Sequence, residues 1–137
     1  MMILFVDHDI NLQEEFYNTF RATNKVFCFN EMFEAYLWLK KGSKRPDIIV
    51  SQVDIHDPAA LQTIKFLESK NKLKDAKLVA FTTELLEDSQ KTWVMSEGAD
   101  AVFEKKNLMN DMSNYINYLN VKKSAASNSK KKKSAKE

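Results

Sequence analysis

One short apolar run between turn residues constrains the fold of this chain more than any other feature. In residues 46–52 (PDIIVSQ), three apolar residues follow a Pro-Asp turn signal, and an acidic loop begins shortly afterwards at residues 54–58 (DIHDP). A continuous apolar run of this length indicates a strand that is buried on both faces, as in the middle of a parallel sheet. Gln52 ends the run, so we expect it at the carboxyl edge of the sheet, where open α/β folds bind their ligands.

Strand-like and helix-like segments alternate along the rest of the chain. Four further strands are predicted at residues 1–6, 25–29, 77–83 and 101–103, and a segment with helical periodicity follows each strand. Strands that alternate with helices of this size imply βαβ units with right-handed crossovers. The predicted fold is therefore a flavodoxin-like (βα)5 doubly wound sandwich, with a parallel five-stranded sheet and helices on both faces.

Local patterns predict two details of the helices. Asn11, with Glu14 three residues later, fits a capping box at the start of the first helix. Phe33, Tyr36 and Leu37 fit the inner stripe of the second helix, which would place them against the core.

Charge is unevenly distributed along the chain. Residues 122–137 contain seven Lys and one Glu, a net charge of +6, whereas the other 14 Lys and Arg and 18 Asp and Glu give residues 1–121 a net charge of −4. We therefore expect a folded domain over residues 1–121 and a disordered Lys-rich tail over residues 122–137. The tail is expected to solubilise the chain or tether a partner, and contact with nucleic acid or an anionic surface is the alternative.

The composition favours a cytoplasmic protein. No apolar run approaches the ~18 residues that a transmembrane helix needs. Residues 1–6 (MMILFV) open the chain with no basic region before them, so no signal peptide is expected. The single cysteine, Cys28, lies in an apolar run and is expected to be a buried thiol in a reducing compartment.

The residues at the strand ends resemble those of a known family. The motifs ILFVDHD, PDIIVSQ, AFTT and GADAVFEKK, in this order on a (βα)5 pattern, resemble the response-regulator receiver domain of two-component signalling. The resemblance extends from residue 1 to about residue 121. It implies a phosphorylation pocket made of an acidic pair, a phospho-acceptor, a hydroxyl and a lysine, which here correspond to Asp7 and His8, Gln52, Thr82 and Lys105.

Two of these positions depart from the family pattern. Gln52 stands where the family has its phospho-acceptor Asp, and because an amide is a poor nucleophile we expect no acyl phosphate there. His8 replaces one of the acids that bind Mg²⁺, a cation that prefers several charged oxygen ligands. Mg²⁺ binding is therefore expected to be weak or absent, and no other cofactor is implied. Lys105 is expected to form an ion pair with Asp7, with Thr82 nearby.

Neighbouring residues leave two alternatives open at this pocket. Asp54, two residues beyond Gln52, could serve as a displaced phospho-acceptor. Histidines and acids could instead converge on a transition metal, although their spacing matches no known metal signature; they are His8, His56, Asp7, Asp9, Asp54 and Asp57.

The resemblance implies a binding module and not an enzyme. We expect a stand-alone, atypical receiver that acts in signal transduction through protein interaction, independently of phosphorylation. The alternatives are an active receiver that a histidine kinase phosphorylates at a non-standard acid such as Asp54, and a scaffold that the basic tail tethers to nucleic acid. Receivers typically bind targets, or dimerise, through the fourth helix, fifth strand and fifth helix; here this face would present Trp93, Val102, Phe103 and Lys106.

Overall fold

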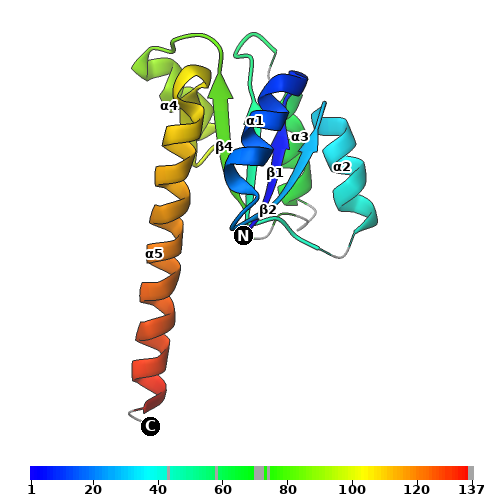
Figure 1. The fold of residues 1–137 in the computed structure, drawn as a ribbon. Helices are drawn as coiled ribbons and strands as arrows, with labels where there is room; N and C mark the ends of the chain where they lie inside the picture. The colour runs from blue at the N-terminus through cyan, green and yellow to red at the C-terminus, as the bar shows by residue number, and fades with distance from the viewer. Residues whose placement is uncertain (43, 58, 70–72, 74, 136–137) are drawn as a thin grey trace. The chain divides into compact units, whose positions relative to one another are not determined.

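The computed structural model describes residues 1–42, 44–57, 59–69, 73 and 75–135, in which strands and helices alternate (Figure 1). The strands are β1 (Met2–Val6), β2 (Lys25–Phe29), β3 (Ile48–Gln52), β4 (Lys77–Thr82) and β5 (Ala101–Glu104). The helices are α1 (Ile10–Phe20), α2 (Met32–Lys41), α3 (Ala59–Ser69), α4 (Asp88–Ser96), the short 3-10 helix η1 (Lys105–Asn107) and α5 (Leu108–Ala135).

The strands form one parallel sheet in the order β2-β1-β3-β4-β5. This is the strand order of flavodoxin-like folds, so the predicted fold class is confirmed. β3 occupies the centre, and its residues Ile48, Ile49 and Val50 are buried, as predicted for a strand that is covered on both faces. The register places Gln52 beside Phe81 of β4, at the carboxyl edge of the sheet.

Helices cover both faces of the sheet. On one face, α2, α3 and α4 contribute to an aliphatic core with strand residues such as Leu4 and Ile49. On the other face, Phe16 of α1 stacks on Phe5 of β1 with ring centroids 4.2 Å apart, and Phe5 stacks on Phe81 at 5.7 Å. Burial of both faces holds the strands in register, which fixes the positions of the loops at their carboxyl ends.

Asp9, and not Asn11, caps helix α1. Its side-chain oxygen accepts hydrogen bonds from the backbone N–H groups of Asn11 (3.0 Å) and Leu12 (3.3 Å). The predicted capping box of Asn11 and Glu14 is therefore wrong. Asp and Asn are similarly good caps, and Asp9 has the advantage that it lies directly before the first helical residue, Ile10.

Helix α2 packs on the core through a different stripe from the one predicted. Met32, Ala35 and Leu39 are buried, whereas Phe33 is 62% exposed and Leu37 is 38% exposed. The predicted inner stripe is therefore wrong for these two residues. Both sets have helical spacing, so periodicity alone does not decide between them, and the small Ala35 lets the helix lie close to the sheet.

The chain divides into two compact units, residues 1–106 and a second unit that begins at residue 107. In the second unit, α5 continues to Ala135, beyond the end expected near Val121. The structure thus gives helical backbone to residues 122–135, where the sequence predicted disorder; residues 136 and 137 lie outside the described residues. This stretch contains no Gly or Pro, and Ala and Lys are strong helix formers, so no residue in it ends the helix.

None of the helices in the described residues has both the length and the apolar character that a membrane-spanning helix needs.

Candidate functional site

The carboxyl ends of β1, β2 and β3 surround a cleft of about 370 Å³. Three residues of the predicted pocket line it: Asp7, His8 and Gln52. The loop after β3 adds two acids, Asp54 and Asp57. The sheet topology therefore brings together residues that are far apart in the sequence, as we predicted from the motifs at the strand ends.

Asp7 is a buried carboxylate without a hydrogen-bond partner among the described residues. Its side chain is fully buried, and neither carboxylate oxygen receives a hydrogen bond there. His8 Nδ1 lies 3.4 Å from Oδ1 of Asp7, but the His8 side chain is 80% exposed. Burial raises the pKa of Asp7, and the nearby ammonium of Lys105 opposes this shift. The charged form of Asp7 is therefore in an unfavourable setting.

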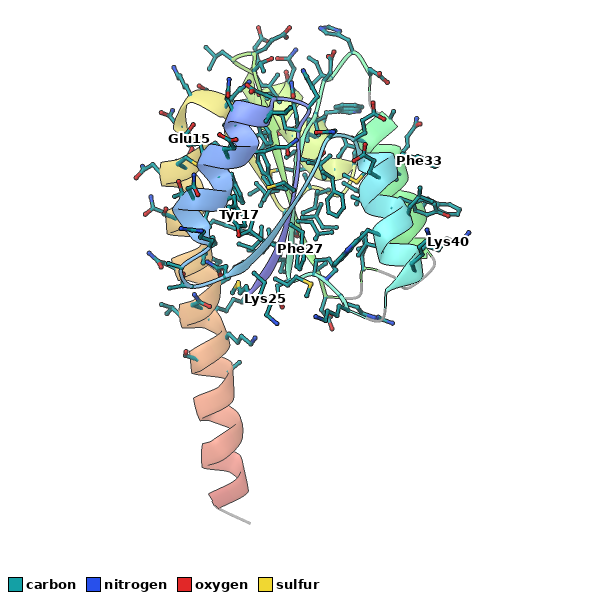
Figure 2. All side chains as sticks on the ribbon, turned by 45° about the vertical axis from the view of Figure 1, so that its right-hand side comes forward. Glu15, Tyr17, Lys25, Phe27, Phe33 and Lys40 are labelled. Atoms are coloured by element: carbon teal, nitrogen blue, oxygen red, sulfur yellow. The ribbon has the colours of Figure 1, made fainter. Side chains whose placement is uncertain are left out.

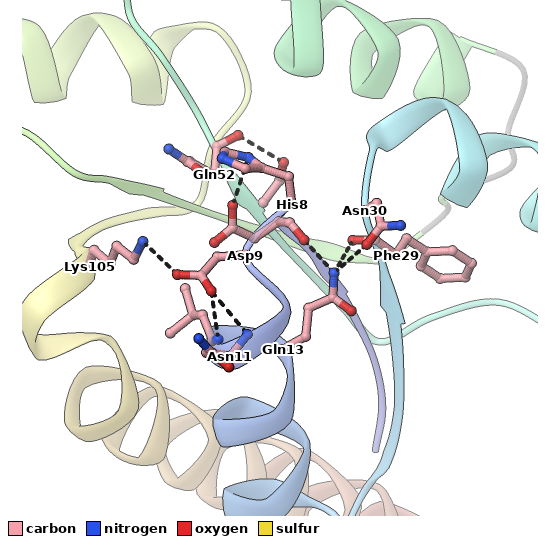
Figure 3. A network of polar contacts seen from close by, with 11 residues as sticks. His8, Asp9, Asn11, Gln13, Phe29, Asn30, Gln52 and Lys105 are labelled. Carbon is pink, nitrogen blue, oxygen red and sulfur yellow. Dashed lines mark hydrogen bonds and ion pairs between the residues drawn. The ribbon is translucent and has the colours of Figure 1, made fainter.

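Lys105 pairs with Asp9 and not with Asp7. Lys105 Nζ lies 3.4 Å from Oδ2 of Asp9 (Figure 3). The predicted Lys105–Asp7 ion pair is therefore wrong. Asp9 is partly exposed, so the ammonium reaches it without the loss of hydration that contact with the buried Asp7 would require. Asp9 could have been found from the sequence, because an Asp directly before a helical stripe is a strong capping signal.

Hydrogen bonds and the end of helix α1 favour the ionised form of the Asp9 carboxylate. The backbone N–H of Leu12 makes the largest contribution to lowering the pKa of Asp9, and the hydrogen bond from Lys105 lowers it further. The positive end of the helix acts in the same direction.

Thr82 and Gln52 adjoin a small hollow of about 70 Å³ at the ends of β3 and β4, and Asp54 lines both this hollow and the larger cleft. Thr82 is buried, and its hydroxyl donates a hydrogen bond of 2.8 Å to the backbone carbonyl of Glu84. This hydroxyl is therefore engaged within its own loop.

Gln13 of α1 ties together the loops after β1 and β2. Its Nε2 donates to the backbone carbonyl of Asp7 at 2.5 Å and to Oδ1 of Asn30 at 2.8 Å (Figure 3). The same nitrogen lies 3.5 Å from the carbonyl of Phe29. Sequence reasoning missed this residue, because a Gln in the first turn of a helix is too common to indicate such a role.

Comparisons with known proteins show a likeness in fold. No protein-family model and no curated protein sequence matches the chain. Among solved structures, the receiver domain of a Francisella response regulator is 16% identical with a TM-score of 0.71, covering 86% of this chain and 94% of that one. The signal receiver domain of a histidine kinase from Syntrophus aciditrophicus is 19% identical with a TM-score of 0.69, covering 86% and 88%.

A response regulator from Burkholderia pseudomallei, solved with a phosphorylated aspartic acid, a calcium ion and citrate, is 18% identical with a TM-score of 0.61. The match covers 76% of this chain and 59% of that one. The chain has the receiver fold.

The acids of this site bear on the expected weakness of Mg²⁺ binding. In the described part of the chain, no group of three or more His, Cys, Asp or Glu side chains is placed to hold a metal ion. The buried carboxylate of Asp7 is a suitable ligand, but Gln52 is neutral and Asp9 is engaged with Lys105 and the helix cap. Neither residue adds a free charged oxygen beside Asp7, and Mg²⁺ prefers several of them, so weak or absent Mg²⁺ binding stays a prediction. His8 and His56 belong to no such group either, and both are exposed.

Four residues of the receiver fold were predicted to form an interaction face. Trp93 of α4 is 39% exposed and lines a hollow of about 230 Å³ with Ile55. Val102 and Phe103 are half-buried in β5, and Val102 packs against the aliphatic core. Lys106 is exposed, with Nζ 3.6 Å from Oε2 of Glu104.

Proposed function

We propose that the protein is a receiver-type signalling module that acts by binding a protein partner, independently of phosphorylation. The observation that carries this proposal is the amide of Gln52 at the end of β3, in the cleft that also contains Asp7. An amide is too weak a nucleophile to accept a phosphoryl group, so the central chemical step of a phosphorylated receiver is missing at this position.

The groups around Gln52 support the same conclusion. Phosphoryl transfer depends on cations and donors positioned around the transferred group. Here the hydroxyl of Thr82 is bonded to Glu84, and the ammonium of Lys105 is paired with Asp9. A phosphoryl group in the cleft would have to compete for both contacts, and the donor set for Mg²⁺ is incomplete.

We place the partner-binding surface around Trp93. Its exposed indole beside a hollow fits an aromatic anchor, a residue type that is enriched in binding hot spots. Lys106 and the neighbouring edge of β5 would extend this surface. We further propose that the protein works in the cytoplasm and does not act as an enzyme.

Mass spectrometry of the intact protein tests the proposal. After incubation with acetyl phosphate and Mg²⁺, we expect an unchanged mass, and a receiver with an Asp phospho-acceptor treated in parallel shows that the reagents work. A phosphoryl adduct on any acid of the cleft overturns the proposal.

Phosphorylation of Asp54 is the rival function, and its position gives it one supporting observation. Asp54 is exposed, and it lines both the cleft and the hollow beside Thr82. One of its oxygens accepts a hydrogen bond of 2.9 Å from the backbone N–H of His56, which leaves the other oxygen for a nucleophilic role. If an adduct forms and Asp54→Asn abolishes it, whereas Asp57→Asn does not, the rival function is correct.

A further inference from the structure

Helix α2 is apolar on two sides. Met32, Ala35 and Leu39 are buried in the core, yet Phe33 remains 62% exposed and Leu37 is 38% exposed. Figure 2 shows Phe33 on the side of α2 that faces away from the sheet. A surface helix normally carries polar residues on this side, and exposed apolar patches mark binding surfaces.

Aromatic rings extend this apolar side from α2 to α3. The ring centroids of Phe33 and Tyr36 are 6.1 Å apart, and those of Tyr36 and Phe66 are 6.0 Å apart. Phe66 is 48% exposed. The rings border a groove of about 360 Å³ whose lining is completed by Ala59, Gln62 and Thr63.

The wall of this groove formed by α3 contains the apolar Ala59 and Phe66 and the polar Gln62 and Thr63. The hydroxyl of Thr63 donates to the backbone carbonyl of Ala59 at 3.0 Å, so it is satisfied within the helix. Apolar side chains of a partner could therefore enter the groove without leaving this hydroxyl unpaired.

One end of the groove is acidic. Ala59 lines both the groove and the cleft at the carboxyl edge of the sheet. At this junction the cleft contributes Glu31, Asp54 and Asp57. Of the ion pairs between described residues, none involves these three acids. The groove therefore suits a segment that presents apolar side chains followed by cations.

Helix α5 of this same chain carries that combination. Tyr118 is 57% exposed and Val121 is 69% exposed, and their spacing of three places them on one side of the helix. The exposed Lys122 and Lys123 follow directly, and Lys122 Nζ lies 5.9 Å from the centroid of the Tyr118 ring. The sequence of residues 122–137 adds the net charge of +6 that opposes the acidic end of the groove.

We propose that the groove between α2 and α3 binds helix α5 of a second copy of this chain. Tyr118 and Val121 of one copy enter the aromatic groove of the other copy, and Lys122 and Lys123 approach the acids beside Ala59. The contact joins two different surfaces, so it is heterologous. Each copy has one groove and one helix α5. It uses neither Gln52 nor Trp93, and it goes beyond the function proposed above.

Sedimentation equilibrium tests the proposal with the full chain. A groove of this size receives few side chains, so we expect weak association, visible as an average mass that rises between about 10 µM and about 1 mM protein. Phe66→Ser and Tyr118→Ser should each weaken association about tenfold or more. Raising the salt concentration should weaken it as well, because part of the attraction is between charges.

The matched control is Leu85→Ser, which removes a side chain that is 77% exposed and does not line the groove. This variant should associate like the unmodified chain. Thermal melting checks that each variant is folded, and Phe33→Ser replaces Phe66→Ser if the latter is not.

Mixing the two deficient variants gives the decisive result. Phe66→Ser keeps an intact α5, and Tyr118→Ser keeps an intact groove, so an equimolar mixture should form a one-to-one dimer although each variant alone stays monomeric. A monomeric unmodified chain at about 1 mM overturns the proposal. So does a mixture that remains monomeric. Neither result affects the phosphorylation test, so failure here is distinct from failure of the proposed function.

Discussion

Lys105 Nζ lies 3.4 Å from Oδ2 of Asp9, and the other oxygen of the same carboxylate caps helix α1. One side chain thus connects the turn after β5 to the start of the first helix. Because the lysine is already neutralised by an acid of this chain, its contact does not depend on a phosphoryl group in the cleft. Lys105 and Asp9 therefore form an ion pair that is complete without a bound ligand.

Replacing Asp9 should destabilise the protein. Asp9→Ala removes both the helix cap and the partner of Lys105, so it should lower the melting temperature more than Asp9→Asn, which keeps a capping oxygen. The pKa of Asp9 is lowered from 3.8, so its stabilising contribution is present above this pH and is lost as the pH falls through the lower, folded-state pKa. The melting temperatures of wild type and Asp9→Asn should therefore converge in acid. A constant difference at every pH would contradict this assignment.

Replacing Asp7 should have the opposite effect. The pKa of Asp7 is raised from 3.8, so its protonated form stabilises the fold below this pH, and that contribution disappears as the pH rises through the folded-state pKa. Asp7→Asn keeps the size of the side chain without the charge, and it should be more stable than wild type at neutral pH. Each unit of pKa shift corresponds to about 1.4 kcal/mol.

Urea unfolding at a series of pH values measures this effect. The advantage of Asp7→Asn should grow as the pH rises from acid to neutral. Asp57→Asn is the control, because it removes an exposed acid from the same cleft and should change stability little. A less stable Asp7→Asn at neutral pH would show that the carboxylate has a favourable partner.

The link made by Gln13 can be tested in the same way. Gln13→Ala removes the donor to the carbonyl of Asp7 and to Oδ1 of Asn30. Loss of these bonds should lower the free energy of unfolding by about 1–2 kcal/mol. Gln13→Glu provides the control, because it keeps the size of the side chain but replaces the donor with an acceptor, and it should be no more stable than Gln13→Ala.

The alternation of buried strands and helices was enough to predict the sheet, because a parallel strand covered on both faces leaves a continuous apolar run such as residues 48–50. The strand ends likewise predicted that Asp7 and Gln52 would line one cleft. Side-chain pairing could not be predicted in this way. Whether Lys105 contacts Asp7 or Asp9 depends on which acid is buried, and burial is a property of the folded chain.

The prediction of the buried stripe of helix α2 was wrong for a related reason. Its sequence carries two apolar stripes of equal period, and the choice between Phe33 and Ala35 for the core depends on how closely the helix lies to the sheet. The extent of α5 could not be predicted from composition, because a Lys-rich sequence suits a disordered tail although Lys and Ala also favour helix.

Removing residues 122–137 separates these two interpretations of the C-terminal segment. If residues 122–135 are helical, truncation after Val121 should lower the helical circular dichroism signal by more than the loss of a disordered segment would. Stability should change by no more than about 0.5 kcal/mol, because this Lys-rich sequence has few apolar residues to bury. An unchanged helical signal per molecule would mean that the segment is disordered in solution.

The last prediction concerns what the cleft lacks. Gln52→Asp alone supplies a nucleophile, but His8 still leaves the Mg²⁺ site short of charge, so we expect only slow Mg²⁺-dependent phosphorylation by acetyl phosphate. Adding His8→Asp places a third carboxylate near Asp7 and position 52, and phosphorylation should become faster, because Mg²⁺ prefers several charged oxygens. Intact-mass spectrometry over time measures both rates.

Melting temperature gives a second readout that does not depend on phosphorylation. A cation that binds only the folded state stabilises it, and the extra carboxylates repel Asp7 when no cation is present. Mg²⁺ should therefore raise the melting temperature of the double variant and leave that of wild type unchanged. Adding Asp7→Asn to the double variant should remove both effects. If Gln52→Asp alone is phosphorylated as fast as the double variant, then His8 is no obstacle, and the absence of the nucleophile is the only departure that matters.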